Sequence, residues 1–433
     1  MYEKIVSLCF FPDWVRSKTF NYLIHLHMQV LELVDFQPFK GILPVLGENE
    51  CICQRVSPPY DIISPEELKE LQSHEYNITN ITLGGENGDY SAAAEKLASW
   101  ISKGIVERDR SECYYLYRQK FKDGDQWLQR NGIIGILKTE DYSEGNVIPH
   151  EETFPKVKED RLNLLKATEA HCESIFGLYD ESDVDLECFP TQKLFSYTDD
   201  LGTVHEIHRI SSRAAVTTLH LMMRHKKILI ADGHHRYETA YRYSQEYPDE
   251  SMKSYVLCTL VSSQDSGMFV RPTHRLVMNL ESDESTIMSA INEQFETKDA
   301  DSPEDALKEM DSIDVPVFGI TFPSGKTILA KYNNAPSEDM WSVDTYVCQE
   351  IMFKKVLAPL VNGDLELSFD HDPSSAVKKV SDGEAKLAIF VKAPSLQKVW
   401  ELAMKDLKMP KKTTYFWPKI WSGFVIYKMK EPQ

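Results

Sequence analysis

The stretch that decides the fold is ILIADGHHRYETA, residues 228–240. Its four leading apolar residues predict a short buried strand. Asp232-Gly233 then predicts a tight turn, because glycine adopts backbone angles that other residues resist. The residues that follow predict a helix from about His235 to Tyr247. The stretch therefore predicts a strand, a turn and a helix in direct succession, with polar side chains gathered at the turn.

The start of this helix has the chemistry of an anion site. The first amide N–H groups of a helix lack intrahelical partners and carry the positive end of its dipole. Arg236 adds a planar charged fork suited to phosphate oxygens. His234 and His235 can donate to an anion or move a proton near pH 7, and Asp232 is a candidate base or Mg²⁺ ligand. The alternative is an ordinary helix start, capped by Asp232, with both histidines on the surface.

A second polar cluster begins at His150-Glu151 and continues to Asp160-Arg161. His150 and Glu151 are candidates for an acid/base pair or for metal ligands. The zinc pattern H-E-x-x-H is excluded, because position 154 is Phe and no second histidine follows at helical spacing. The alternative interpretation is a solvated, charged loop, which is what most runs of charge are.

Two shorter segments carry further candidates. In Ser-Pro-Pro-Tyr-Asp, residues 57–61, the two prolines impose an extended approach that presents Tyr60 and Asp61 just before a capped helix at Ser64. In Arg-Pro-Thr-His-Arg, residues 271–275, a histidine and two arginines at the start of a strand would complete an anion pocket. Either segment can equally be structural when considered alone.

Composition narrows the classes of function. The chain has 433 residues and a net charge of −19, which argues against general binding to nucleic acids, because their backbone phosphates need Lys and Arg. The sequence contains no apolar run long enough to span a membrane. Eight cysteines are scattered along the chain, including the pair Cys51 and Cys53. We expect reduced thiols and a cytoplasmic protein without a disulfide framework.

The chain is too long for one hydrophobic core. We expect an N-terminal extension of unknown role over residues 1–35, a core that carries the ligand site over 36–290, and a smaller α+β region packed on that core over 291–433. Helices, a hairpin and isolated strands alternate without a fixed period, which predicts an α+β fold with a mixed sheet. The sequence also predicts these elements: a hairpin from Tyr114 to Leu137, a helix over 161–170, a strand over 269–280, paired strands around 323–325, a long helix over 343–360, and a closing strand pair over 415–428.

Taken together, these motifs resemble the DUF1015 family of uncharacterised conserved proteins, for which no activity is firmly assigned. The resemblance extends from about Phe36 to the C-terminus and rests on these segments: Phe39-Lys40-Gly41, Pro58-Pro59-Tyr60-Asp61, His150-Glu151 with Thr153, Asp160-Arg161-Leu162, residues 231–240, Pro272-Thr273-His274-Arg275, Met409-Pro410, Thr414-Tyr415-Phe416 and Pro418-Lys419.

The Asp-Gly-His-His-Arg turn also resembles, more loosely, the phosphate-binding turn of the ParB/sulfiredoxin superfamily, which includes nucleotide-dependent free-serine kinases. This resemblance implies that Gly233, His234, His235 and Arg236 hold phosphate and that Asp232 or Glu151 is the base. It also implies a nucleotide, ATP or ADP, with Mg²⁺, and serine or a related compound as the small ligand.

Three functions remain open on the sequence. The first is a nucleotide-dependent phosphotransferase acting on serine or a related hydroxyl metabolite, the second a phosphatase acting on phosphoserine or a similar ester, and the third a nucleotide- or metabolite-binding protein without turnover. In each, the partner is a small phosphorylated molecule or nucleotide, while the metal and the oligomeric state stay open. Neither a P-loop nor G-x-G-x-x-G occurs. All readings predict that three groups converge on His234: His150-Glu151, Asp160-Arg161 and Thr273-His274-Arg275.

Overall fold

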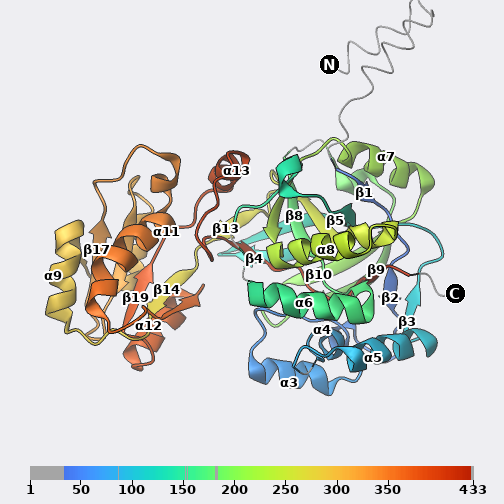
Figure 1. Cartoon of the computed structure of the whole chain (residues 1–433), viewed down its shortest axis with the longest axis horizontal. Helices are drawn as coiled ribbons and strands as arrows, with labels where there is room; N and C mark the ends of the chain where they lie inside the picture. Colours follow the sequence, from blue (N-terminus) through green and yellow to red (C-terminus); the bar gives the residue numbers. More distant parts are fainter. Residues whose placement is uncertain (1–33, 86, 152, 154, 181–183, 431–433) are drawn as a thin grey trace, which may run out of the picture.

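The computed structural model describes residues 34–430 except 86, 152, 154 and 181–183 (Figure 1). Nearly all of the extension expected over residues 1–35 therefore lies outside the described residues. The rest forms two lobes, each built on its own sheet, which lie side by side in Figure 1. Both lobes combine strands with covering helices, so the expected α+β class with a large mixed sheet is confirmed.

The larger lobe is built on a nine-stranded sheet in the order β6-β11-β8-β12-β5-β4-β10-β9, with β1 beside β5. Its strands are β1 (Phe36–Gln37), β4 (Tyr114–Asp123), β5 (Gln126–Lys138), β6 (Val147–Ile148), β8 (Ile175–Tyr179), β9 (Gln192–Thr198), β10 (Val204–Ile210), β11 (Ile228–Asp232) and β12 (Tyr255–Ser262). The pairs β11–β6 and β12–β8 are parallel and the others are antiparallel. The predicted hairpin is confirmed as β4–β5.

Helices of the larger lobe are α3 (Pro65–Ser73), α4 (Thr79–Thr82), α5 (Ser91–Ser102), α6 (Pro155–Thr168), α7 (Arg213–Met223) and α8 (His234–Glu246). The start of α3 is a complete capping box, in which the Ser64 hydroxyl accepts from the Glu67 amide and the Glu67 side chain accepts from the Ser64 amide. Helices α6 and α8 lie next to each other across the face of the sheet (Figure 1). This arrangement brings the segment after His150 close to the start of α8.

The smaller lobe is a six-stranded sheet in the order β15-β17-β16-β19-β14-β18. Its strands are β14 (His274–Val277), β15 (Glu296–Ala300), β16 (Val317–Thr321), β17 (Thr327–Lys331), β18 (Leu367–Asp370) and β19 (Leu387–Phe390), and its helices are α9 (Glu284–Gln294), α10 (Pro303–Met310), α11 (Asp344–Val347) and α12 (Pro373–Ser381). The strands predicted around 323–325 pair as β16 and β17. The helix predicted over 343–360 forms, but its middle, Cys348–Leu357, winds as a π-helix.

The strand predicted over 269–280 is two strands in different sheets. β13 (Phe269–Arg271) pairs with β20 (Tyr415–Trp417), whereas β14 belongs to the smaller lobe. Pro272 lies between them, and a proline has no amide hydrogen with which to continue a ladder. Residues 272–273 are therefore the crossing between the lobes, well before the boundary expected at residue 290.

The C-terminal tail returns to the larger lobe. Helix α13 (Leu396–Met404) and the residues that follow it share a core with apolar residues near the start of the described chain, such as Phe39 and Leu43. The predicted closing pair is wrong in its partners, because β20 pairs with β13, and β21 (Tyr427–Lys428) pairs with β7 (Ala170–His171). A further two-stranded sheet joins β2 (Ile42–Pro44) and β3 (Val106–Arg108). The region expected over 291–433 thus contributes to both lobes.

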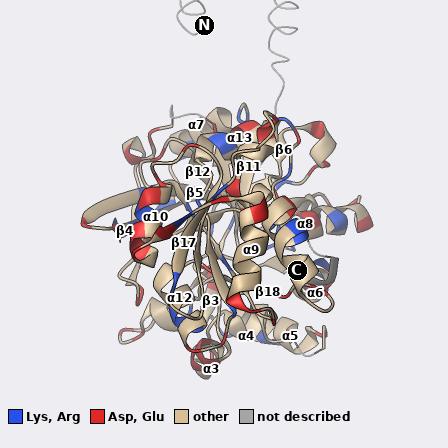
Figure 2. Cartoon of the chain, turned by 90° about the vertical axis from the view of Figure 1, so that its left-hand side faces the viewer, with Lys and Arg blue, Asp and Glu red and all other residues tan. Residues whose placement is uncertain are grey.

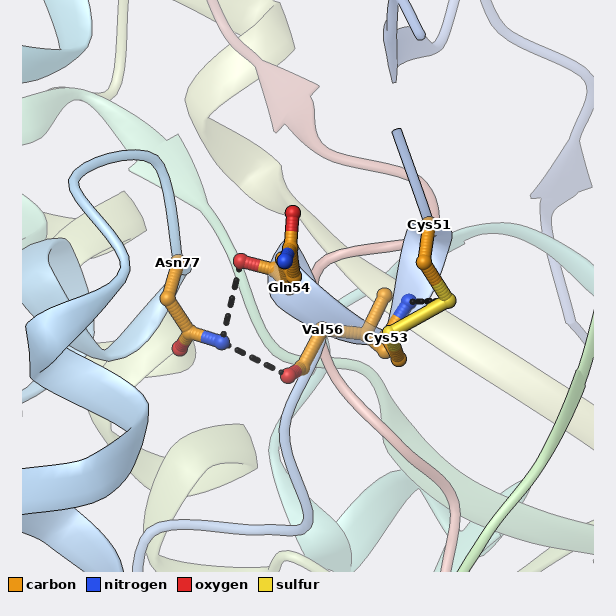
Figure 3. Close-up of a disulfide and its surroundings, with 5 residues drawn as sticks. All are labelled: Cys51, Cys53, Gln54, Val56 and Asn77. Carbon is orange, nitrogen blue, oxygen red and sulfur yellow. Dashed lines mark hydrogen bonds between the residues drawn. A yellow bond between two sulfur atoms is a disulfide. The ribbon is translucent and has the colours of Figure 1, made fainter. Parts of the chain in front are cut away.

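Cys51 and Cys53 form a disulfide, contrary to the expectation of reduced thiols (Figure 3). Cys51 precedes a short 3₁₀ turn, Ile52–Gln54, which brings the two Cα atoms to 5.1 Å. Nearby, the Asn77 side chain donates to the carbonyl oxygens of Gln54 and Val56. Five other cysteines in the described part of the chain are free thiols, and Cys9 lies outside it.

Charged residues are spread over many elements of both lobes, with acidic and basic positions interspersed (Figure 2). Such mixing is typical of a solvated surface. Across the described residues, no helix is both long and apolar enough to cross a membrane.

Candidate functional site

The turn at Asp232-Gly233 has the geometry that the sequence predicts. Gly233 precedes α8 with φ +93°, in the left-handed region that favours glycine. A Cβ atom at this position would also lie 3.0 Å from the Ile175 side chain and 3.1 Å from the Arg236 guanidinium. The backbone angle therefore favours glycine here, and the close approach of Ile175 and Arg236 leaves little room for a Cβ atom.

A cavity of about 220 Å³ opens at the start of α8. It is lined by three segments that are far apart in the sequence together with the turn itself: Tyr60, Asp61, Ile62, Glu151, Ala231, Asp232, Gly233, His234, His235, Arg236, Lys412, Thr414, Tyr415 and Lys419. The structure thus brings together eight of the predicted site residues, from Tyr60 to Arg236. We call this space the α8 cavity.

Two buried cations flank Asp232 in the α8 cavity. The Arg236 guanidinium and the Lys419 ammonium each lie 3.3 Å from a different oxygen of its carboxylate. Burial by itself raises the pKa of Asp232, but the charges of Lys419 and Arg236 outweigh it and bring the pKa down to about 2. Asp232 is consequently ionised at neutral pH and orients both cations, which makes it a weak proton acceptor.

The pKa of Glu151 shifts in the direction opposite to that of Asp232. Burial raises the pKa of its carboxyl group to about 7, although a backbone hydrogen bond and the positive charge at Lys412 act against this rise. A carboxyl group with this pKa is present in both protonation states near neutral pH, which is the property required of a general acid or base. Of the two predicted bases, Glu151 has the more suitable pKa.

The histidines of the motif differ in their surroundings. His150 is fully buried behind the cavity wall, where its Nδ1 bonds to the Ile230 carbonyl at 2.7 Å and its Nε2 to the Thr414 hydroxyl at 2.8 Å. Its backbone amide donates to Nε2 of His234. Burial lowers the pKa of His150 to about 4 and that of His234 well below its ordinary value. Both rings are neutral, and His235 is the more exposed histidine of the cavity.

Arg161 and Asp160 lie behind the cavity, where they form a supporting network. The Arg161 guanidinium lies 4.5 Å from the centre of the Tyr60 ring and 3.5 Å from the buried carboxylate of Glu173. Glu173 also accepts from the Tyr60 amide, while Arg236 donates to the neighbouring Ser174 carbonyl at 2.6 Å. Arg161 therefore holds the wall that carries Tyr60, and Asp160 pairs with Arg161.

Thr273, His274 and Arg275 lie outside the α8 cavity, in contrast to the expected convergence. Arg275 donates to the carbonyl oxygens of Thr273, Lys411 and Lys412. The His274 ring packs edge-on against Phe390 in the smaller lobe. Because its guanidinium is occupied by backbone carbonyls, Arg275 fixes the loop that carries Lys412 into the cavity.

Five residues at or beside the site are not predicted as site residues from the sequence; they come from the tail and from the β7–β8 link, namely Lys412, Thr414, Tyr415, Lys419 and Glu173. Thr414-Tyr415 and Pro418-Lys419 are part of the family pattern, which was the available signal. Neither segment has local features of a site. Their residues reach the α8 cavity only because the C-terminal tail folds back onto the larger lobe. Among the described residues, no group of three or more His, Cys, Asp or Glu side chains is arranged to hold a metal ion.

The model of the family described as "Protein of unknown function (DUF1015)" matches residues 36–347. No curated protein matches the sequence. Solved structures with some similarity include a conserved hypothetical protein from Pyrococcus furiosus (14% identity, 63% of this chain, 87% of that chain, TM-score 0.34). Another is a free serine kinase in complex with AMP (14% identity, 63% of this chain, 84% of that chain, TM-score 0.35). A third is SbnI with a C-terminal truncation from Staphylococcus aureus (8% identity, 69% of this chain, 90% of that chain, TM-score 0.36).

Proposed function

The chain belongs to the DUF1015 family, whose description assigns no activity, and we propose that its site transfers a phosphoryl group from a nucleotide to the hydroxyl group of a small metabolite such as serine. One observation carries the proposal. In a single cavity, a helix start with two buried cations faces a carboxyl group whose pKa is about 7. The helix start with its two cations suits a phosphate group, and the carboxyl group of Glu151 suits an acceptor hydroxyl.

The phosphate end of the reaction is assigned to the start of α8. The start of α8, the Arg236 guanidinium and the Lys419 ammonium supply hydrogen-bond donors and positive charge. Lys412 adds a third cation from the tail. Phosphoryl transfer depends mainly on positioning and on stabilising the charge of the transferred group, and these groups provide both.

The acceptor end is assigned to Glu151. Its carboxylate takes the proton of the acceptor hydroxyl as that oxygen bonds to the terminal phosphorus. The bond between this phosphorus and the bridging oxygen breaks, and the nucleotide leaves one phosphate shorter. The pKa of about 7 allows Glu151 to accept the proton and then to release it to water.

Mg²⁺ fits this assignment through Asp61. Protein sites commonly hold Mg²⁺ with one or two carboxylates together with substrate phosphates, so a cluster of protein ligands is unnecessary. Asp232 is paired with Lys419 and Arg236, whereas Asp61 is exposed on the cavity wall. When bound, Mg²⁺ would neutralise phosphate charge.

The test uses the whole chain with ATP, Mg²⁺ and serine, followed by separation of the products. We expect ADP and phosphoserine in equal amounts. Glu151→Gln should lose the transfer and keep nucleotide binding by calorimetry, whereas Arg236→Ala should lose binding. Phosphate release from phosphoserine without a nucleotide would establish the phosphatase instead, and binding with no turnover of any hydroxyl metabolite would establish a binding protein.

A further inference from the structure

A second cavity lies further along α8 and is not used by the proposed chemistry. It has a volume of about 520 Å³ and is lined by three tyrosines, Tyr142, Tyr237 and Tyr241, and by charged residues of α6 and α8. The two cavities use consecutive parts of one helix, since residues 234–236 line the first and residues 237–239 line the second. We call the second space the tyrosine cavity.

Tyr142 provides an unused polar group in this wall. Its ring stacks on Tyr237, with 5.4 Å between centroids and 15° between the planes. The Tyr237 hydroxyl is satisfied by the backbone of Glu140. The Tyr142 hydroxyl, by contrast, is buried and has no hydrogen-bond partner within the described part of the chain. Because this oxygen is not open to solvent, a ligand can supply the missing partner only after a neighbouring side chain moves.

The charges of the two cavities differ. In the tyrosine cavity, Lys158 pairs with Glu238 and Arg242 pairs with Glu159, each at 2.8 Å. Both of these cations are therefore neutralised by protein carboxylates. Glu140 and Asp141 add two further carboxylates to this lining and Lys408 adds one cation, whereas the lining of the α8 cavity has three cations and three carboxylates. An aromatic and largely neutralised wall suits an uncharged ring system rather than a second phosphate.

The spacing along α8 connects the two cavities. Tyr241 lies six positions after His235, and a helix rises about 1.5 Å per residue, so their Cα atoms lie about 9 Å apart along the axis. The pKa of His235 responds to charges from both linings, namely Glu238 and Lys158 of the tyrosine cavity and Asp61 and Lys412 of the α8 cavity. A ligand that occupies both spaces would have to extend over about this distance along α8.

We propose that the tyrosine cavity binds the nucleoside part, the base and sugar, of the nucleotide whose phosphates lie at the start of α8. This inference rests on the proposed function, because it takes the phosphate position from it. Tyr142 would offer its hydroxyl to the nucleoside, and the exposed side chain of Lys408, whose ammonium lies 6.0 Å from the Tyr142 ring centroid, can move to admit a base.

The experiment compares two ligands by calorimetry on the full chain: ADP and inorganic pyrophosphate. Pyrophosphate can occupy only the α8 cavity, whereas ADP would use both. Tyr142→Ala should weaken ADP binding about tenfold and leave pyrophosphate binding unchanged. Trp127→Ala, which removes an exposed aromatic ring on the β4–β5 hairpin, is the matched control and should change neither affinity.

Other results of these binding measurements would contradict the inference. Unchanged ADP binding in Tyr142→Ala would overturn the inference, as would an equal loss for ADP and pyrophosphate. Weaker binding of serine with unchanged ADP would assign the cavity to the acceptor instead. Tyr241→Ala repeats the comparison if a thermal melt shows that Tyr142→Ala is unfolded. If neither ADP nor pyrophosphate binds the unaltered chain, the proposed function itself fails.

Discussion

Replacement of Gly233 by alanine tests whether the turn before α8 positions Arg236. The left-handed angle costs a non-glycine residue about 1–2 kcal/mol. The new methyl group would also lie 3.0 Å from Ile175 and 3.1 Å from the Arg236 guanidinium, and crowding of this kind adds about 1–3 kcal/mol. We therefore expect Gly233→Ala to lower the free energy of unfolding by about 2–5 kcal/mol and to displace Arg236.

The matched control is Gly104→Ala, just after α5. Gly104 has φ +69°, but a Cβ atom there would meet nothing within 4 Å. In this variant the free energy of unfolding should fall only by the cost of the left-handed backbone angle, about 1–2 kcal/mol. Urea unfolding measures both losses, and calorimetry with pyrophosphate should show weaker binding in Gly233→Ala alone. Equal destabilisation of the two variants, together with unchanged pyrophosphate binding, would refute the role assigned to Gly233.

Two further predictions concern the charges of the α8 cavity. A carboxyl group whose folded pKa is raised costs stability once the pH exceeds its unfolded value, here from 4.5 up to the folded value of about 7. Glu151→Gln should therefore unfold at a higher temperature than the unaltered chain at pH 8 and at a similar temperature near pH 4; an advantage that does not grow with pH would contradict the raised pKa. Lys419→Met removes one partner of Asp232 and should weaken pyrophosphate binding tenfold or more, and calorimetry that shows no change would remove Lys419 from the phosphate site.

Local sequence was sufficient for the centre of the site. A run of four apolar residues, Asp232-Gly233 and the polar start of α8 are consecutive, so the strand, turn and helix follow from short-range preferences. The hairpin β4–β5 and the cap at Ser64 were predictable for the same reason. Each of these features depends on neighbours within a few positions.

The remaining parts depend on contacts between distant segments. Lys419 reaches Asp232 only because the tail crosses back to the larger lobe, and no local pattern near Lys419 encodes that return. The sequence of residues 271–275 predicts the start of a single strand, but Pro272 separates strands of two different sheets. Glu173 lies in an ordinary stretch before β8, and burial between Arg161 and Arg236 gives it its role. The burial of these side chains and their interaction partners arise only in the folded chain, so local sequence does not predict them.

The pairing of β13 with β20 has a consequence for how the protein is made. Phe269 pairs with Trp417, and the whole smaller lobe is synthesised between them. Ribosomes add about 5–20 residues per second, so the intervening stretch of about 150 residues takes roughly 10–30 s. During that interval the edge of β13 and the apolar surface later covered by the tail are exposed on the nascent chain. Chains interrupted before Lys419 would carry a smaller lobe but an incomplete α8 cavity, and would present that surface to chaperones and proteases.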